Sequence, residues 1–163
     1  MLPSEELRQY ISETNDIDLN KYAWSEELKQ QIFSTKLDKD LEENADILND
    51  IYQMGFNIGH CGLTSRYICR QFPEATLYYG KASLLIGTPS SPNGEHAWVT
   101  INGYLVDSTL MICIPLTEIN QLGYIPEKEI THDGARILSE YDRYDLEYEK
   151  LRQSQITHKK TNQ

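Results

Sequence analysis

Alternating residue types around position 100 predict a two-stranded β-hairpin. Both flanks, 99–101 and 104–106, are rich in β-branched, aromatic and aliphatic residues, which favour strands. Asn102 and Gly103 stand between them. This pair is typical of a two-residue type I′ turn, in which both residues need a positive φ. Such a turn fixes the register, and the expected opposite pairs are Ile101 with Tyr104, Val99 with Val106, and Trp98 with Asp107.

The two faces of this hairpin differ in character because side chains alternate along a strand. The more polar face is expected to carry His96, Trp98, Thr100, Leu105, Asp107 and Thr109. The apolar face is predicted to join the core through Ala97, Val99, Ile101, Tyr104 and Val106. His96 and Asp107 are diagonal neighbours, with Cβ atoms expected about 7 Å apart. An imidazole and a carboxylate can form a hydrogen bond across that gap.

Hydrophobic positions at helical spacing predict several helices before the hairpin. Ser4 is an expected N-cap, and the helix after it would turn Leu7, Tyr10 and Ile11 inward. Ser25 is expected to cap a second helix that ends near Phe33 and buries Leu28 and Ile32. A third helix is expected from about residue 38 to Gly55, and a fourth over 63–71, directly after Cys61.

The remaining elements are expected to be strands, loops and a C-terminal helix. Strands are predicted for 75–79, 81–86 and 111–115, loops for 87–94 and 126–134, and a short helix for 116–122. The C-terminal helix, about 135–153, carries a tyrosine-rich stripe of Ile137, Tyr141, Tyr144, Tyr148 and Leu151. We expect this stripe to pack on the body of the domain, with a partner-binding surface as the alternative.

Length and pattern together predict one α+β domain, with helices packed on an antiparallel sheet. A chain of 163 residues is long enough to bury a substantial core. We expect one domain over 1–163, with N-terminal helices in 1–56, a central core in 57–115 and a frayed tail in 154–163.

Composition limits the partners that the chain can bind. Its 25 acidic and 15 basic residues give a formal net charge of −10. Nucleic acids and anionic membrane surfaces attract basic residues, so we expect neither as a partner. No apolar run is long enough to span a bilayer. The sequence does not indicate an oligomeric state.

The three cysteines indicate a reducing compartment, because an odd number cannot all pair and none stand in closely spaced zinc-ligand pairs. No secretory signal is visible near the start. We therefore expect a cytoplasmic protein without metal or other cofactor, although export by a route without a signal stays open. A metal site made of Cys61, His96 and Asp107 is the weaker alternative.

Cys61 stands where nucleophilic chemistry is favoured. A thiol at a helix start is stabilised as a thiolate by the free backbone N–H groups and the helix dipole, and the same N–H groups can hold an oxyanion. Gln53 or Asn57 are alternative sources of an oxyanion-binding amide, or they belong to the preceding helix alone. Cys69 and Cys113 lie in apolar surroundings and are expected in the core.

Three short motifs within residues 59–109 resemble the core of the transglutaminase-like superfamily, a branch of the papain-like thiol enzymes. They read Gly59-His60-Cys61-Gly62, His96-Ala97-Trp98-Val99 and Val106-Asp107-Ser108-Thr109. The resemblance implies a papain-like fold, with Cys61 as nucleophile, His96 as base and Asp107 as the residue that orients it. Trp98 is expected to line the substrate site or to pack beneath the Cys61 helix.

This resemblance implies acyl chemistry on an amide of a peptide or protein. We expect water to resolve the thioester, as in a cysteine peptidase or a protein glutamine deamidase. Transglutaminase-type transfer to an amine is one alternative. The other is a binding module that keeps the fold without catalysis, although all three triad residues are present.

Overall fold

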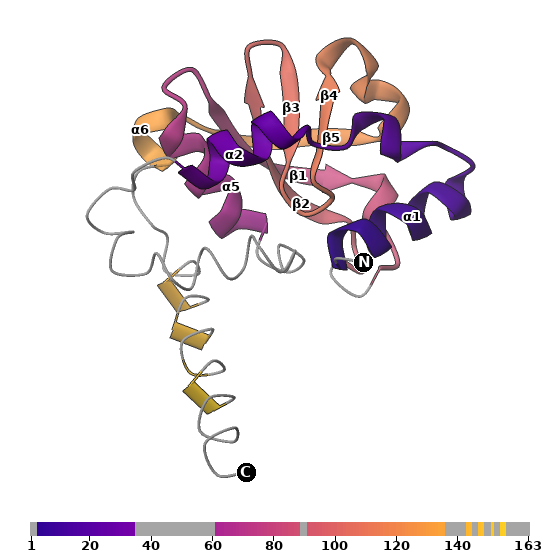
Figure 1. The fold of residues 1–163 in the computed structure, drawn as a ribbon, viewed down its shortest axis with the longest axis horizontal. Coiled ribbons are helices and arrows are strands. Elements are labelled where there is room, and N and C mark those ends of the chain that lie inside the picture. The colour runs from indigo at the N-terminus through magenta and orange to yellow at the C-terminus, as the bar shows by residue number, and fades with distance from the viewer. Residues whose placement is uncertain are drawn as a thin grey trace.

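The computed structural model describes residues 3–34, 61–88 and 91–135, together with 143–144, 147–148, 151 and 154–155. In this part of the chain, helices accompany one five-stranded antiparallel sheet with the strand order β4-β3-β2-β1-β5 (Figure 1). The α-helices are α1 (Pro3–Asn15), α2 (Glu26–Ser34), α5 (Cys61–Gln71) and α6 (His132–Ala135). The strands are β1 (Thr76–Ala82), β2 (Glu95–Ile101), β3 (Tyr104–Asp107), β4 (Ile112–Pro115) and β5 (Tyr124–Ile130). The 3-10 helices are η1 (Leu19–Tyr22), η2 (Ser83–Leu85) and η3 (Leu116–Leu122). The expected α+β class is confirmed.

The predicted hairpin is present as β2 and β3. Val99 pairs with Val106 and Ile101 with Tyr104, which is the predicted register. The turn residues have the expected positive φ, 47° at Asn102 and 86° at Gly103. Local turn chemistry therefore sets the position of every side chain along these two strands.

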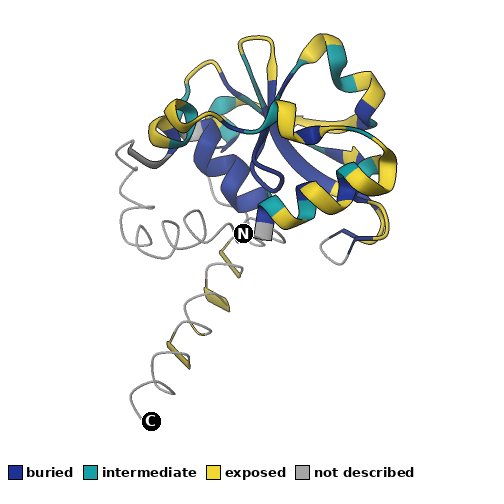
Figure 2. Ribbon diagram, turned by 45° about the vertical axis from the view of Figure 1, so that its right-hand side comes forward, coloured by how far each residue is buried: buried dark blue, intermediate teal, exposed yellow. Residues whose placement is uncertain are grey.

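Both faces of the sheet are buried, whereas the sequence predicted a core on one face alone. On the first face, α2 and α5 cover Ala97, Val99 and Val106, and Figure 1 shows these two helices close together. Residues 62–69 of α5 are all buried, and Figure 2 shows most of this helix in dark blue. On the second face, Trp98 and Leu105 pack with hydrophobic residues of α1, η1, η2 and η3. The His96 side of the hairpin is therefore an interior surface.

Two strands differ from the expectation because of how β1 and β5 pair. A single strand, β1, runs through Gly80, and η2 replaces the strand that was predicted for 81–86. A Cβ at Gly80 would lie 2.1 Å from the carbonyl oxygen of Ile125, so only glycine permits this approach of β5. The predicted loop over 126–134 is wrong, since β5 includes Pro126. Proline is tolerated there because β5 is an edge strand and the register shifts at this point.

The predicted N-terminal helices are largely correct. Helix α1 begins at Pro3, so Ser4 lies in its first turn and is not its N-cap, and Tyr10 is exposed although Ile11 is buried. Ser25 caps α2 as expected, because its Oγ accepts a hydrogen bond of 3.1 Å from the backbone N–H of Leu28. The helix expected over 38–55 lies outside the described residues. No helix that the structure describes has the length and apolar character needed to cross a membrane.

The described part of the C-terminal stripe does not pack on the domain. Tyr144, Tyr148 and Leu151 are all exposed, so the prediction that the stripe packs on the body of the domain is wrong for these three positions. Ile137 and Tyr141 lie outside the described residues. These three residues follow the helical spacing of the stripe, but that spacing does not determine whether a helix face meets a core.

The N-terminal segment holds the turn that follows β3. Nη1 of Arg8 donates to the carbonyl of Leu110 at 2.9 Å, and the backbone N–H of Trp24 donates to Met111 at 2.9 Å. The indole of Trp24 donates to Ile112 at 3.0 Å. Three successive carbonyls beyond Asp107 are thus bound by residues from the first 24 positions.

We expect Arg8→Met to lower the free energy of unfolding by about 1–3 kcal/mol, because it leaves the buried carbonyl of Leu110 without this donor. Lys29→Met is the matched control, since Lys29 forms a surface ion pair with Glu26 and such pairs contribute about 0–1 kcal/mol. Urea unfolding of both variants measures the difference. Equal midpoints for the two variants would show that Arg8 does not support this turn.

Candidate active site

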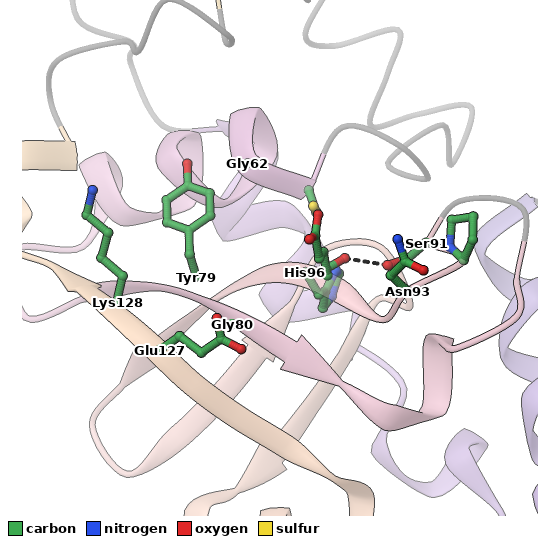
Figure 3. Close-up of a pocket in the computed structure, with 11 residues that line it drawn as sticks. Gly62, Tyr79, Gly80, Ser91, Asn93, His96, Glu127 and Lys128 are labelled. Atoms are coloured by element: carbon green, nitrogen blue, oxygen red, sulfur yellow. Dashed lines mark hydrogen bonds between the residues drawn. The ribbon is translucent and has the colours of Figure 1, made fainter.

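The sequence-predicted nucleophile and base lie together at a cavity of about 430 Å³ (Figure 3). Cys61 is the first residue of α5, and His96 is the second residue of β2. Both line one cavity with Gly62. The cavity extends past Tyr79, Glu127 and Lys128, and the segment 91–93 forms another part of its wall. The thiol of a helix start therefore opens onto a space that a substrate group can enter.

His96 connects Cys61 to Asp107. Its Nε2 donates a hydrogen bond of 2.7 Å to Oδ2 of Asp107, and the Cys61 side chain is close enough to the same imidazole to raise its pKa. Since Nε2 is directed at Asp107, Nδ1 is the nitrogen that remains for the thiol. The three side chains form a continuous chain across three elements, α5, β2 and β3. Within the described residues, no group of three or more His, Cys, Asp or Glu is arranged to hold a metal ion.

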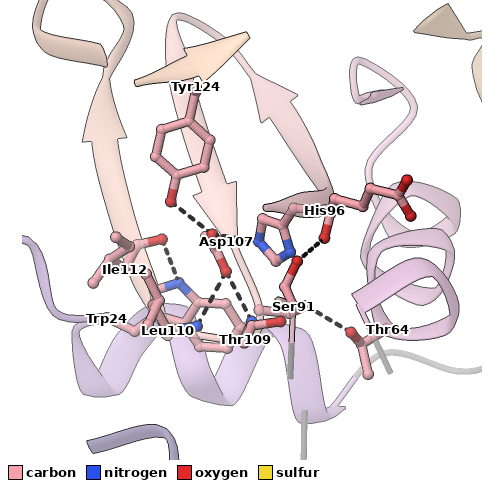
Figure 4. Close-up of polar contacts among 11 residues, drawn as sticks. Trp24, Thr64, Ser91, His96, Asp107, Thr109, Leu110, Ile112 and Tyr124 are labelled. Carbon is pink, nitrogen blue, oxygen red and sulfur yellow. Dashed lines mark hydrogen bonds and ion pairs between the residues drawn. The ribbon is translucent and has the colours of Figure 1, made fainter. Parts of the chain in front are cut away.

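The Asp107 carboxylate is fully buried and accepts four hydrogen bonds (Figure 4). Oδ1 accepts from the backbone N–H groups of Thr109 at 2.9 Å and Leu110 at 3.1 Å. Oδ2 accepts from His96 and, at 2.7 Å, from the hydroxyl of Tyr124. Burial alone would raise the pKa of Asp107. The charge of His96 and the hydrogen bonds from His96, Tyr124 and Leu110 outweigh it and lower that pKa.

His96 is held in its charged form by this surrounding. Burial opposes protonation, but the charge of Asp107, the hydrogen bond to it and the contact with Cys61 raise the pKa of His96 to about 10. Imidazolium is therefore the form present near neutral pH. A cation next to a thiol favours the thiolate, so the arrangement is suited to nucleophilic attack by sulfur.

Tyr124 belongs to the site, although no pattern in the sequence indicated it. It is the first residue of β5 and is buried. Burial, and next the charge of and hydrogen bond to Asp107, raise the pKa of the Tyr124 phenol well above its usual value. The hydroxyl therefore stays a hydrogen-bond donor. No motif marks this tyrosine, and its contact with Asp107 depends on strand order alone.

Trp98 does not line the cavity. Its exposed fraction is 2%. It packs in the hydrophobic cluster on the second face of the sheet, the second core, instead of beneath α5. Its ring stacks on Tyr78 with centroids 6.4 Å apart, and it meets Tyr124 edge-on at 5.3 Å. The His96 ring lies 6.2 Å from it. Trp98 thus provides a buried hydrophobic neighbour for the imidazole and is not part of the cavity lining.

Two further contacts hold the ends of the site in place. Thr64 on α5 and Ser108 after β3 share a hydroxyl hydrogen bond of 2.6 Å, which connects the Cys61 helix to the Asp107 strand. In the loop that leads to His96, the Ser91 hydroxyl donates to the carbonyl of Glu95. This loop forms part of the cavity wall. Gln53 and Asn57, the alternative oxyanion donors, lie outside the described residues.

The other two cysteines differ from Cys61 in their surroundings. Cys69 is buried in the core, and this burial raises the pKa of its thiol to about 11. Burial also raises the pKa of Cys113. Both were expected in the core, and Cys69 belongs to it while Cys113 is half-buried against it. A raised thiol pKa makes both less reactive near neutral pH.

Comparisons of the chain with protein-family models, with curated proteins and with solved structures find no match. The functional assignment therefore depends on the residues and geometry described above.

We expect the free energy of unfolding to fall as the pH rises from 6.5 to about 10, because the folded protein keeps a proton on His96 that the unfolded chain releases. This stabilisation is complete below the ordinary pKa of 6.5 and is lost as the pH passes about 10. The slope for one proton is at most about 1.4 kcal/mol per pH unit.

Urea unfolding across this range, for the wild type and for His96→Gln, measures the contribution. The substitution removes the titrating group, so its stability should depend less steeply on pH. If the two proteins lose stability in parallel, His96 is not the group that carries the proton.

Proposed function

We propose that the protein is a thiol-dependent amide hydrolase of the transglutaminase-like type, with Cys61, His96 and Asp107 as its catalytic residues. The observation that carries the proposal is that Cys61 and His96 line one cavity while His96 is hydrogen-bonded to the buried Asp107 at 2.7 Å. A nucleophile, a base and an orienting carboxylate in this order define the general triad arrangement. One residue of each motif that resembles the superfamily, Cys61, His96 and Asp107, belongs to this group of side chains.

The proposed first half-reaction forms a thioester. The Cys61 thiolate attacks the carbonyl carbon of an amide and forms a C–S bond, which gives a tetrahedral oxyanion. The oxyanion collapses while His96, as imidazolium, transfers its proton to the amide nitrogen. The C–N bond breaks, ammonia or an amine leaves, and His96 becomes neutral.

The second half-reaction returns the enzyme to its starting state. Neutral His96 takes a proton from water, and the oxygen attacks the thioester carbonyl. The C–S bond breaks, which releases the carboxylic acid and restores the thiolate and the imidazolium. The sum is one amide and one water converted to an acid and an amine. Asp107 stabilises the imidazolium in both steps without taking its proton.

The oxyanion is proposed to bind at the start of α5. The first N–H groups of a helix have no acceptor within the helix, and α5 begins at Cys61 and continues through Gly62. Backbone donors at this position stabilise negative charge on the carbonyl oxygen without the need to reorganise. The absence of a side chain at Gly62, which also lines the cavity, leaves room for the substrate carbonyl.

The proposed substrate is a peptide or protein amide. The cavity is lined by Tyr79 and by the charged residues Glu95, Glu127 and Lys128, of which the last three are exposed. A wall of this kind suits a polar segment of polypeptide better than a compact apolar molecule. Water is the proposed acceptor, which makes the protein a cysteine peptidase or a glutamine deamidase, and an amine acceptor would make it a transglutaminase.

The test combines thiol alkylation with product mass. Iodoacetamide near neutral pH should modify Cys61 faster than Cys69 or Cys113. Peptides with internal glutamine, incubated with and without a primary amine, should show deamidation or cleavage by mass spectrometry. Cys61→Ala should abolish either reaction, and His96→Gln should slow it by about 10²–10⁴.

Cys113→Ala is the matched control and should retain full activity. An amine adduct in place of hydrolysis would assign acyl transfer and not hydrolysis. Fast alkylation of Cys61 with no reaction on any peptide would restrict the assignment to a reactive thiol. Preferential alkylation of Cys69 or Cys113 would overturn the triad.

A further inference from the structure

Two donors share one oxygen of Asp107. Oδ2 accepts from Nε2 of His96 at 2.7 Å and from the hydroxyl of Tyr124 at 2.7 Å. The two donors come from different strands, β2 and β5, which lie on opposite sides of β1 in the sheet. Tyr124 is also packed edge-on against Trp98, so its hydroxyl has a fixed direction.

We propose that Tyr124 is a positioning residue that holds Asp107 in place and weakens the hydrogen bond between the Asp107 carboxylate and protonated His96. The inference rests on the proposed function, because it concerns proton transfer from His96 to the leaving amine. A carboxylate oxygen that accepts a second hydrogen bond carries less negative charge toward the first donor. With Tyr124 in place, the imidazolium is a stronger acid than it would be beside Asp107 alone.

The position of the Tyr124 hydroxyl indicates that it changes the acidity of His96 and does not only fill space. If packing alone were required, an apolar ring would serve, because the surroundings of Tyr124 are the hydrophobic residues of the second core. The hydroxyl instead donates to the buried carboxylate of Asp107 at 2.7 Å. An imidazolium that was bound too tightly would keep its proton and leave the amine a poor leaving group, so a competing donor at Oδ2 assists the step.

Other titratable groups also act on His96 and must be distinguished from Tyr124. Cys61 faces it from α5, and Asp107 faces it from β3. Glu95, Glu127 and Lys128 line the cavity onto which His96 opens. A Tyr124→Phe variant leaves all five unchanged, so a shift in pH dependence is assigned to the phenol alone.

The experiment compares Tyr124→Phe with the wild type in two assays, the pH profile of Cys61 alkylation and the rate of peptide hydrolysis. Removal of the Tyr124 hydroxyl strengthens the interaction of the Asp107 carboxylate with the imidazolium. We expect the change in alkylation rate that marks the loss of the His96 proton to move to higher pH, by about half a unit to one unit, as expected for a single lost hydrogen bond to a charged group. Hydrolysis should slow by about tenfold, since general acid catalysis contributes about 10²–10⁴ in all.

Tyr104→Phe is the control, because Tyr104 is a half-exposed tyrosine of β3 outside the cavity, and it should change neither assay. Urea unfolding of each variant confirms that the folded protein is compared. A fall in both alkylation and hydrolysis without a shift in the alkylation profile would reduce Tyr124 to a structural role and overturn the proposal. An unchanged profile with unchanged hydrolysis would also overturn it.

The alkylation profile separates this inference from the proposed function. If no peptide is hydrolysed by the wild type, the hydrolase assignment fails while the profile still reports whether Tyr124 acts on His96. If hydrolysis is present and the profile does not shift, the positioning role fails alone.

Discussion

The buried carboxylate of Asp107 is the interaction on which the rest of the structure depends. An isolated ionised carboxylate in an apolar interior is strongly disfavoured, and here the cost is offset by four hydrogen bonds and a charged imidazole. The donors come from β2, from β5 and from the turn after β3. Each of these segments must therefore be in place before the carboxylate is stable. The same contacts orient His96 toward Cys61, so the stability of the sheet and the geometry of the site have one origin.

The N-terminal segment completes this arrangement from outside the sheet. Arg8 and Trp24 bind the carbonyls of the turn whose N–H groups hold Asp107. The backbone N–H groups of this turn thus bind the Asp107 carboxylate. Its backbone carbonyls bind Arg8 of α1 and Trp24. The face of the sheet that carries His96 is closed by α1, η1, η2 and η3, and His96 borders the cavity where β2 begins, together with Cys61.

The sequence predicted those parts of the site that depend on local chemistry. Asn102 and Gly103 determine their turn by their own φ preferences, and the alternation around them then places His96 and Asp107 on one face. Tyr124 was not predictable, because its hydroxyl reaches Asp107 only if β5 lies beside β1. That strand order, and the opening that Gly80 leaves for it, are properties of the whole sheet. The alternation placed Trp98 on the same face as His96, so it was expected at the substrate site or beneath the Cys61 helix. The alternation could not show that α1 and η1 cover that face.

The protonation state of His96 tests the central claim most directly. Nitrogen NMR of the imidazole, followed from neutral pH upward, reports whether one or both ring nitrogens carry a proton. The account predicts that both are protonated near neutral pH and that the ring loses its proton only as the pH approaches about 10. It also predicts that alkylation of Cys61 lowers this midpoint, because it removes the Cys61 contact that raises the pKa of His96 while Asp107 remains. A His96 that titrates near its ordinary value of 6.5, with no response to alkylation, would contradict a charged chain from Cys61 to Asp107.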